Sequence, residues 1–168
     1  MNNIGSCLSF LGRVDEAIKF YEKALIINSD YAYAHHDLGN ALILIGQSKV
    51  GVNSIEKAIE INPEFAEAHK SLGNFFKTRK QRDKSQIYFE TAYKIKSDMD
   101  FLFGEILNNQ RHLCAWTDSR GSLIKLEKKI VNKEKVIDPF ALLSLVDSPV
   151  LQRKAAEIKA NSDFPKNN

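Results

Sequence analysis

The strongest constraint on the fold of this chain is a self-similarity at an offset of 34 residues. The offset aligns Ile4, Leu38 and Leu72, and a glycine follows each of them. It also aligns a series of apolar and small residues further along each copy: Leu8, Leu42 and Phe76; Ala17, Gly51 and Ser85; Tyr21, Ile55 and Phe89; Ala24, Ala58 and Ala92. The sequence therefore predicts three copies, over residues 1–31, 32–65 and 66–99, each burying its apolar face against its neighbour.

Each copy reads as a helix–turn–helix hairpin, because apolar residues recur at helical spacing, as in Leu38–Leu42. Gly12 and Gly46 mark the turn inside a copy, whereas the third copy carries Lys80 there. Asn62-Pro63 marks the turn between copies, since proline disfavours helix at the residue before it. The small residues that align with Gly51 are expected where two helices approach closely.

These positions resemble the tetratricopeptide repeat (TPR) family in the following residues: Leu38-Gly39, Leu42, Gly51, Ile55, Ala58 and Pro63. The resemblance implies an all-α fold, a right-handed superhelix (α-solenoid) of helix–turn–helix hairpins. His35 and His69 stand where the family usually has tryptophan. The first copy begins inside its first helix, so we expect the natural array to continue upstream of Met1.

The TPR resemblance also implies a concave face, lined by the first helix of each pair, that takes extended peptides. Mapped onto this sequence, the candidate residues are Tyr33, His36, Asp37, Asn40, Lys70, Ser71, Asn74 and Lys77. Asn40 and Asn74 lie one period apart, and their amides could bond a peptide backbone because they both donate and accept. Ser6 takes this place in the first copy. The alternative is a set of solvated polar residues without a specific ligand.

The residue-by-residue match ends at 99, so residues 100–168 are predicted to form a helical cap or linker. Residues 101–116 read as one further helix that closes the stack, and Leu123, Leu126 and Ile130 mark an amphipathic helix. Asp138-Pro139 and Ser148-Pro149 each place a capping residue before a proline, and so predict the starts of two short helices.

The tail carries a second resemblance, to the linker of bacterial TPR glycosyltransferases similar to O-linked N-acetylglucosamine transferase and the Spindly group. The residues concerned are Cys114-Ala115-Trp116, Asp138-Pro139-Phe140-Ala141-Leu142-Leu143-Ser144-Leu145, Asp147-Ser148-Pro149 and Leu151-Gln152. The resemblance implies the TPR-and-linker fragment of a protein that transfers a sugar from a UDP-sugar to protein serine or threonine. The family's donor-binding Lys and His have no counterpart, so we predict no catalytic residue and no cofactor. Alternatives are a generic helical cap, or a stand-alone TPR scaffold or chaperone adaptor.

Composition excludes other classes of protein. The net charge of +3 is mild, and no stretch of 18 apolar residues occurs, so we expect neither nucleic-acid nor membrane binding. The basic run 77–84 is predicted to be a solvated turn, with an anionic partner site as the alternative. His35-His36 lacks a further ligand at i+4, so no metal is expected. A cytoplasmic protein is predicted, with Cys7 and Cys114 reduced and at least half-buried; a disulfide or reactive thiol is the alternative.

Overall fold

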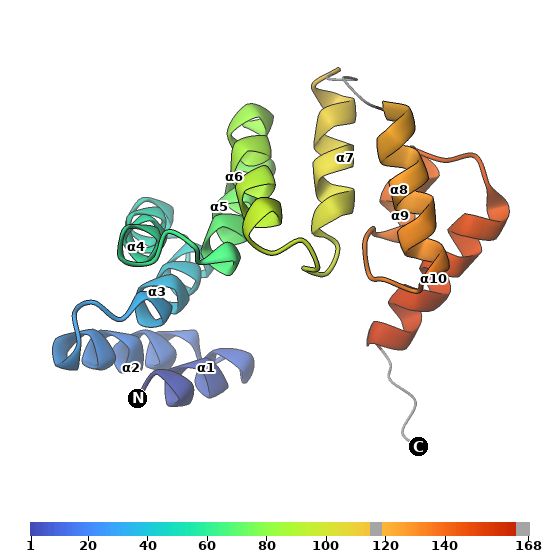
Figure 1. Cartoon of the computed structure of the whole chain (residues 1–168). Helices are drawn as coiled ribbons and strands as arrows, with labels where there is room; N and C mark the ends of the chain where they lie inside the picture. The colour runs from blue at the N-terminus through green and yellow to red at the C-terminus, as the bar shows by residue number, and fades with distance from the viewer. Residues whose placement is uncertain (115–118, 164–168) are drawn as a thin grey trace. The chain divides into compact units, whose positions relative to one another are not determined.

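The computed structural model describes residues 1–114 and 119–163. Over these ranges the chain contains ten α-helices and no strand, which confirms the predicted all-α fold (Figure 1). The helices are α1 Asn2–Phe10, α2 Val14–Ile27, α3 Ala32–Leu44, α4 Ser48–Ile61, α5 Ala66–Thr78, α6 Arg82–Ile95, α7 Leu102–His112, α8 Ser119–Val131, α9 Pro139–Leu143 and α10 Pro149–Asp163. None of these helices combines the length and the apolar content needed to cross a membrane.

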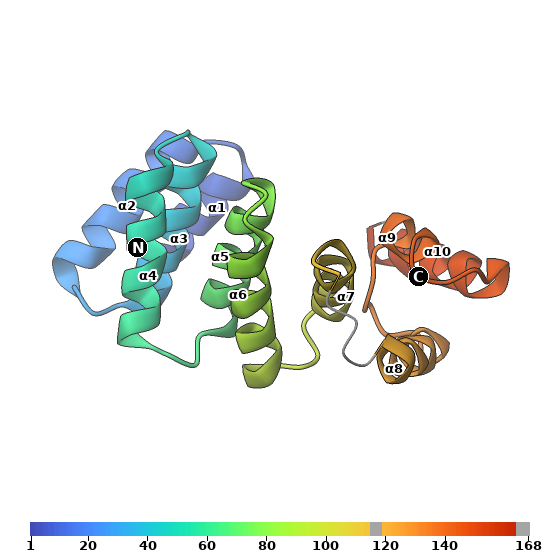
Figure 2. The same cartoon turned by 90° about the horizontal axis from the view of Figure 1, so that it is seen from above.

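The chain divides into two compact units, a first unit Met1–Phe75 and a second unit Phe76–Asn168. The boundary falls within α5, inside the predicted third copy. The predicted division into repeats over 1–99 and a tail over 100–168 stays a prediction. The first unit contains the hairpins α1–α2 and α3–α4 followed by most of α5 (Figure 2). Within it, α3 packs against α4 and also against both α1 and α2.

The turn inside each hairpin has a left-handed backbone, as the glycine pattern predicts. Gly12 and Gly46 have φ values of 77° and 88°, which glycine adopts without strain. Lys80 stands at the equivalent place in the second unit and has a φ of 60° although it carries a Cβ. The turn geometry is therefore retained where its preferred residue is absent.

The small residues of the second copy lie where its two helices approach most closely. A Cβ atom at Gly39 of α3 would lie 2.5 Å from Ile55 Cγ1 and 2.6 Å from the Gly51 carbonyl oxygen of α4. A Cβ at Gly51 would lie 2.6 Å from the Gly39 carbonyl oxygen. These distances are too short for any side chain, so the predicted close approach is confirmed at this helix pair.

The turns between copies repeat in atomic detail. The Asn28 side-chain oxygen accepts from the Asp30 amide at 3.1 Å, and the Asn62 oxygen accepts from the Glu64 amide at 3.2 Å. Each turn is also contacted by the histidine at the family's tryptophan position. The two contacts, His35 Nε2 to the Ser29 carbonyl and His69 Nε2 to the Pro63 carbonyl, measure 2.8 Å and 3.0 Å. These histidines therefore join the first helix of one copy to the turn that follows the previous copy.

In the second unit, α7 continues the pattern of burial beyond the end of the sequence match. Residues 102, 103, 106 and 107 are buried, and they correspond at the 34-residue offset to residues 68, 69, 72 and 73 of α5, which are also buried. Helix α7 packs against α6, where the fully buried Asn109 donates to Ser85 Oγ at 2.9 Å. It therefore acts as the first helix of a further copy.

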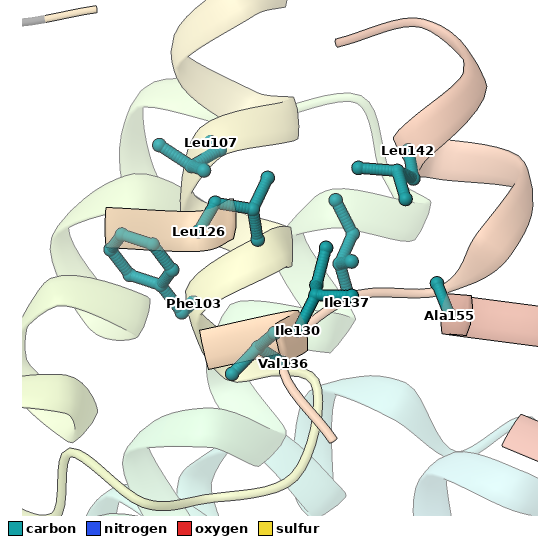
Figure 3. Close-up of a cluster of buried hydrophobic side chains, with 8 residues drawn as sticks. All are labelled: Phe103, Leu107, Leu126, Ile130, Val136, Ile137, Leu142 and Ala155. Atoms are coloured by element: carbon teal, nitrogen blue, oxygen red, sulfur yellow. The ribbon is translucent and has the colours of Figure 1, made fainter. Parts of the chain in front are cut away.

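The rest of the tail encloses a hydrophobic core shared by α7, α8, α9, α10 and the segment before α9 (Figure 3). Its buried members are Phe103, Leu107, Leu126, Ile130, Val136, Ile137, Leu142 and Ala155. The predicted caps are confirmed: Asp138 accepts from the Phe140 amide at 3.0 Å, and Ser148 Oγ lies 3.5 Å from the Leu151 amide. The tail is thus a packed helical layer on α7.

Two expectations for the tail and the cysteines are wrong. The helix predicted over 101–116 ends at His112, because Cys114 has a φ of 53° that no helix continues. Ala115 and Trp116 lie outside the described residues. Both cysteines are exposed rather than buried. Cys7 is two positions after the buried Gly5, a rotation of about 200° around α1, and so lies away from α2.

Candidate peptide-binding face

The predicted groove residues divide between the two compact units. Seven of them lie in the first unit, on α3 and on the part of α5 that belongs to it: Tyr33, His36, Asp37, Asn40, Lys70, Ser71 and Asn74. Tyr33 and Asn74 are exposed and the other five are half-buried. Lys77 lies in the second unit, where its ammonium contacts Glu105 Oε1 at 2.8 Å. We call the seven residues of the first unit the candidate face.

A hydrogen-bond network centred on Asp37 joins α1 to α3. Asn2 Nδ2 and Ser6 Oγ, both on α1, donate to Asp37 Oδ2 at 3.0 Å and 3.2 Å. His36 Nδ1 lies 3.2 Å from the other carboxylate oxygen, Oδ1. The carboxylate is therefore held by three side chains before any ligand approaches.

His36 extends the network to α5. Its Nε2 accepts from Asn40 Nδ2 at 3.0 Å and lies 3.0 Å from Ser71 Oγ. Because the Asn40 amide nitrogen donates to Nε2, Nδ1 is the ring nitrogen that can donate to Asp37. The first helices of three successive copies are thus linked through the Asp37 carboxylate and the His36 ring.

The environment keeps Asp37 ionised. Burial raises the pKa of its carboxyl group, but hydrogen bonds from His36, Asn2 and Ser6, together with the electrostatic attraction of the His36 ring, outweigh burial and hold that pKa below its usual range. A full negative charge is therefore present at neutral pH on the surface shared by α1 and α3.

Aromatic rings form the neighbouring part of the candidate face. The ring centroid of Tyr33 lies 4.7 Å from that of the buried Phe65 and 6.0 Å from that of Tyr31. The ring centroid of His36 lies 5.0 Å from that of Phe65. Tyr33 remains 54% exposed, so this ring offers an apolar surface that is already fixed in position.

An open pocket of about 350 Å³ adjoins the Asp37 network. Residues from α1, α2 and α3 line it: Ser6, Ser9, Tyr21, Asp37, Asn40, Ala41 and Leu44. Its polar groups are one carboxylate, one amide and three hydroxyl groups, and Ala41 and Leu44 supply an apolar wall. The pocket is a concave feature of the candidate face within the first unit.

Sequence reasoning placed four α3 residues on one face but missed their partners Asn2, Tyr31 and Phe65. A signal for the hydrogen bonds was present, because the contacting residues are separated by about one period. Asn2 lies 35 positions before Asp37, and His36 lies 35 positions before Ser71. Polar side chains separated by about one period on the first helices are therefore candidates for hydrogen bonds between neighbouring copies.

The other sequence features have ordinary structural partners. In the basic run, Arg82 donates to Asn109 Oδ1 at 3.0 Å, and Lys84 lies 5.2 Å from the centre of the Phe76 ring. His35 and His36 each contact different groups, as described above. In the described part of the chain, no three His, Cys, Asp or Glu residues group together in a way that could hold a metal ion.

Comparisons with known proteins agree with this architecture. Two family models match, "TPR repeat" over residues 11–46 and "Tetratricopeptide repeat" over residues 32–65. The crystal structure of MamA is similar with a TM-score of 0.63 at 18% identity, over 96% of this chain and 78% of that chain. A second crystal structure of MamA protein gives 0.60 at 17% identity, over 99% and 76%. A search of curated proteins finds no matching sequence.

Residues 11–65 therefore carry tetratricopeptide repeats, and the all-α fold is similar to that of solved TPR solenoids. The structural likeness extends over the third copy and the tail, which the family models do not reach. At these identities it shows the fold alone. Tetratricopeptide repeats generally act as protein-interaction scaffolds, and this is the class of protein that the matched repeats imply.

Proposed function

We propose that the chain is a non-enzymatic interaction module that holds an extended peptide of a partner protein against the candidate face of the first unit. The observation that carries the proposal is the network through Asp37 and His36, which fixes α1, α3 and α5 against one another. A binding surface whose side chains are already ordered loses less conformational entropy when a partner binds.

Several side chains of the candidate face offer groups that can contact a bound peptide. Asn40 uses Nδ2 on His36, and within the described residues its Oδ1 makes no hydrogen bond, so it can accept from a peptide amide. Asn74, one period later, is exposed and offers both a donor and an acceptor. Tyr33 adds an aromatic surface, and Lys70 adds a positive charge on α5. Lys77 remains a candidate at the start of the second unit.

The test is selection of peptides from a random-sequence library on the immobilised full chain, followed by affinity measurement on variants. Asn40→Ala and Asn74→Ala should each weaken the selected peptides about three- to ten-fold, the loss expected for one or two hydrogen bonds. Asn53→Ala is the matched control, since Asn53 is an exposed asparagine on the second helix α4. Equal losses in all three variants, or none in any, would contradict the proposal.

A finer proposal is that this module is the TPR-and-linker portion of a glycosyltransferase similar to O-linked N-acetylglucosamine transferase. Its support is the order of residues in the tail, above all the stretch from Asp138 to Leu145. Capping by Asp138 and burial of Leu142 account for two of those residues without any such relation. The alternative remains a stand-alone scaffold or chaperone adaptor.

Incubation of the chain with a UDP-sugar and an acceptor peptide tests the non-enzymatic part of the proposal. We expect neither hydrolysis of the donor nor labelling of the peptide. Turnover that scales with protein concentration would overturn this part. A pull-down that recovers only the C-termini of chaperones would favour the adaptor alternative.

A further inference from the structure

We propose that the pocket beside Asp37 binds the side chain of a lysine from the partner polypeptide. The inference rests on the proposed function, because it specifies the chemistry of one residue in the bound peptide. The pocket opens on the surface of the first unit, and its volume of about 350 Å³ is large enough to admit a single side chain.

The charges in and around the pocket favour a cation. The three side chains that hold the Asp37 carboxylate are Asn2, Ser6 and His36, and none of them is a lysine or an arginine. The described residues that line the pocket include no lysine or arginine. The first unit as a whole has six basic and nine acidic side chains.

The shape and polarity of the pocket suit an ammonium group on an aliphatic stem. Asn40 Oδ1 and Ser9 Oγ provide acceptors in addition to the carboxylate, and an ammonium group brings three donors and no acceptor. Ala41 and the largely exposed Leu44 can cover the methylene groups of a lysine, which pack on apolar surface while the charged end stays solvated or paired.

The repeat itself supplies an example of this interaction. Two periods after Ser9 and Asp37, the chain has Lys77 and Glu105. There the Lys77 ammonium contacts Glu105 Oε1 at 2.8 Å, with both side chains half-buried. The matching burial patterns of α5 and α7 support this register, as described above.

The first unit therefore has the carboxylate of this pair without its lysine. Ser9 is a short side chain where the second unit has Lys77, and it lines the pocket beside Asp37. The intermediate pair, Ile43 and Ser71, carries no charge. We infer that a lysine from outside the chain takes the place that Lys77 fills in the second unit.

The test is an NMR titration of the ¹⁵N-labelled full chain with Nα-acetyl-lysine N-methylamide. Nα-acetyl-norleucine N-methylamide, which has the same stem without the ammonium group, is the matched control probe. We expect saturable shifts of the Ser9, Asn40 and Leu44 amides with the lysine probe alone. Absence of saturable shifts, or equal shifts with norleucine, would overturn the proposal.

Two variants sharpen the result by moving the lysine within the repeat. Ser9→Lys leaves Asp37 and its network in place but fills the pocket from within, so the lysine probe should no longer bind there. Lys77→Ser should do the reverse and create new saturable shifts around Glu105. Asp37→Asn, which removes the carboxylate charge, should also abolish binding of the lysine probe if the variant folds. Undiminished binding of the probe to the Ser9→Lys variant would overturn the proposal whether or not Asp37→Asn folds.

Selected peptides separate this inference from the proposed function. Replacing the critical lysine of such a peptide with norleucine should weaken it about ten-fold, the loss expected for one charge-assisted hydrogen bond. Peptides that bind the candidate face with no preference for lysine would overturn the pocket proposal and leave the proposed function standing. If no peptide binds that face, the proposed function fails, while the probe titration still decides the pocket.

Discussion

The turn at Lys80 allows a direct exchange experiment on the repeat. A left-handed backbone costs an L-residue about 1–2 kcal/mol. Glycine avoids this cost but loses more conformational freedom on folding, worth about 0.5–1 kcal/mol. Since Lys80 has a φ of 60° where Gly12 and Gly46 have 77° and 88°, Lys80→Gly should increase the free energy of unfolding by about 0.5–1 kcal/mol.

The reciprocal change, Gly46→Lys, should decrease the free energy of unfolding by about 1 kcal/mol. Among the described residues, no atom outside Gly46 and its two chain neighbours lies within 4 Å of the position that a Cβ would take there, so the effect comes from the backbone rather than from a clash. Urea unfolding followed by circular dichroism measures both changes, as shifts of the midpoint at constant slope. For a chain of this size, 1 kcal/mol corresponds to about 2–4 °C in Tm.

Charge is the competing explanation, because Lys80 lies within the basic run 77–84. Lys80→Gln removes the charge but keeps the Cβ, so it should change stability much less than Lys80→Gly does. If the glutamine variant is stabilised as much as the glycine variant, repulsion rather than backbone strain is responsible. An unchanged midpoint for Lys80→Gly would refute the reasoning outright.

Three further changes test other parts of the structure. Gly39→Ala places a Cβ 2.6 Å from a backbone oxygen and should destabilise the chain by about 1–3 kcal/mol in thermal unfolding; an unchanged Tm would mean that the helices lie further apart. Asp138→Ala removes the cap on Phe140 N and should cost about 1 kcal/mol in urea, and a negligible loss would count against this cap. The lowered pKa of Asp37 contributes stability above its unfolded value of about 3.9 that is lost as pH falls through the folded pKa. The stability difference between the chain and Asp37→Asn should therefore be constant above about pH 5 and shrink below pH 4, and a constant difference down to pH 2 would contradict this.

The parts of the fold that the sequence predicts correctly are those set by local residue chemistry. A turn glycine at residue 46 needs no distant partner to define its backbone, and the cap at Asp138 is formed by the residues that follow it. The close approach of Gly39 and Gly51 involves two helices of one hairpin, so the repeat itself indicates it. The repeat helps to predict the turn and the close helix approach, because the same backbone geometry recurs in each copy.

The site was predictable only in part, because its geometry depends on side chains that meet between copies. Periodicity places His36 and Asp37 on one face, but adjacent helical residues do not by themselves specify that one ring contacts Asp37, Asn40 and Ser71 at once. The exposure of Cys7 was missed for a related reason. Residue type favours burial of cysteine, whereas its position on α1 turns it away from the neighbouring helix.

The central claim is that partners bind through the first helices of the hairpins. Chemical-shift mapping of a selected peptide on the ¹⁵N-labelled chain tests it most directly. We expect the largest shifts on α3 around His36 and Asn40 and on α5 around Ser71 and Asn74. Shifts confined to the second helices α2 and α4, with the His36 network unaffected, would contradict it.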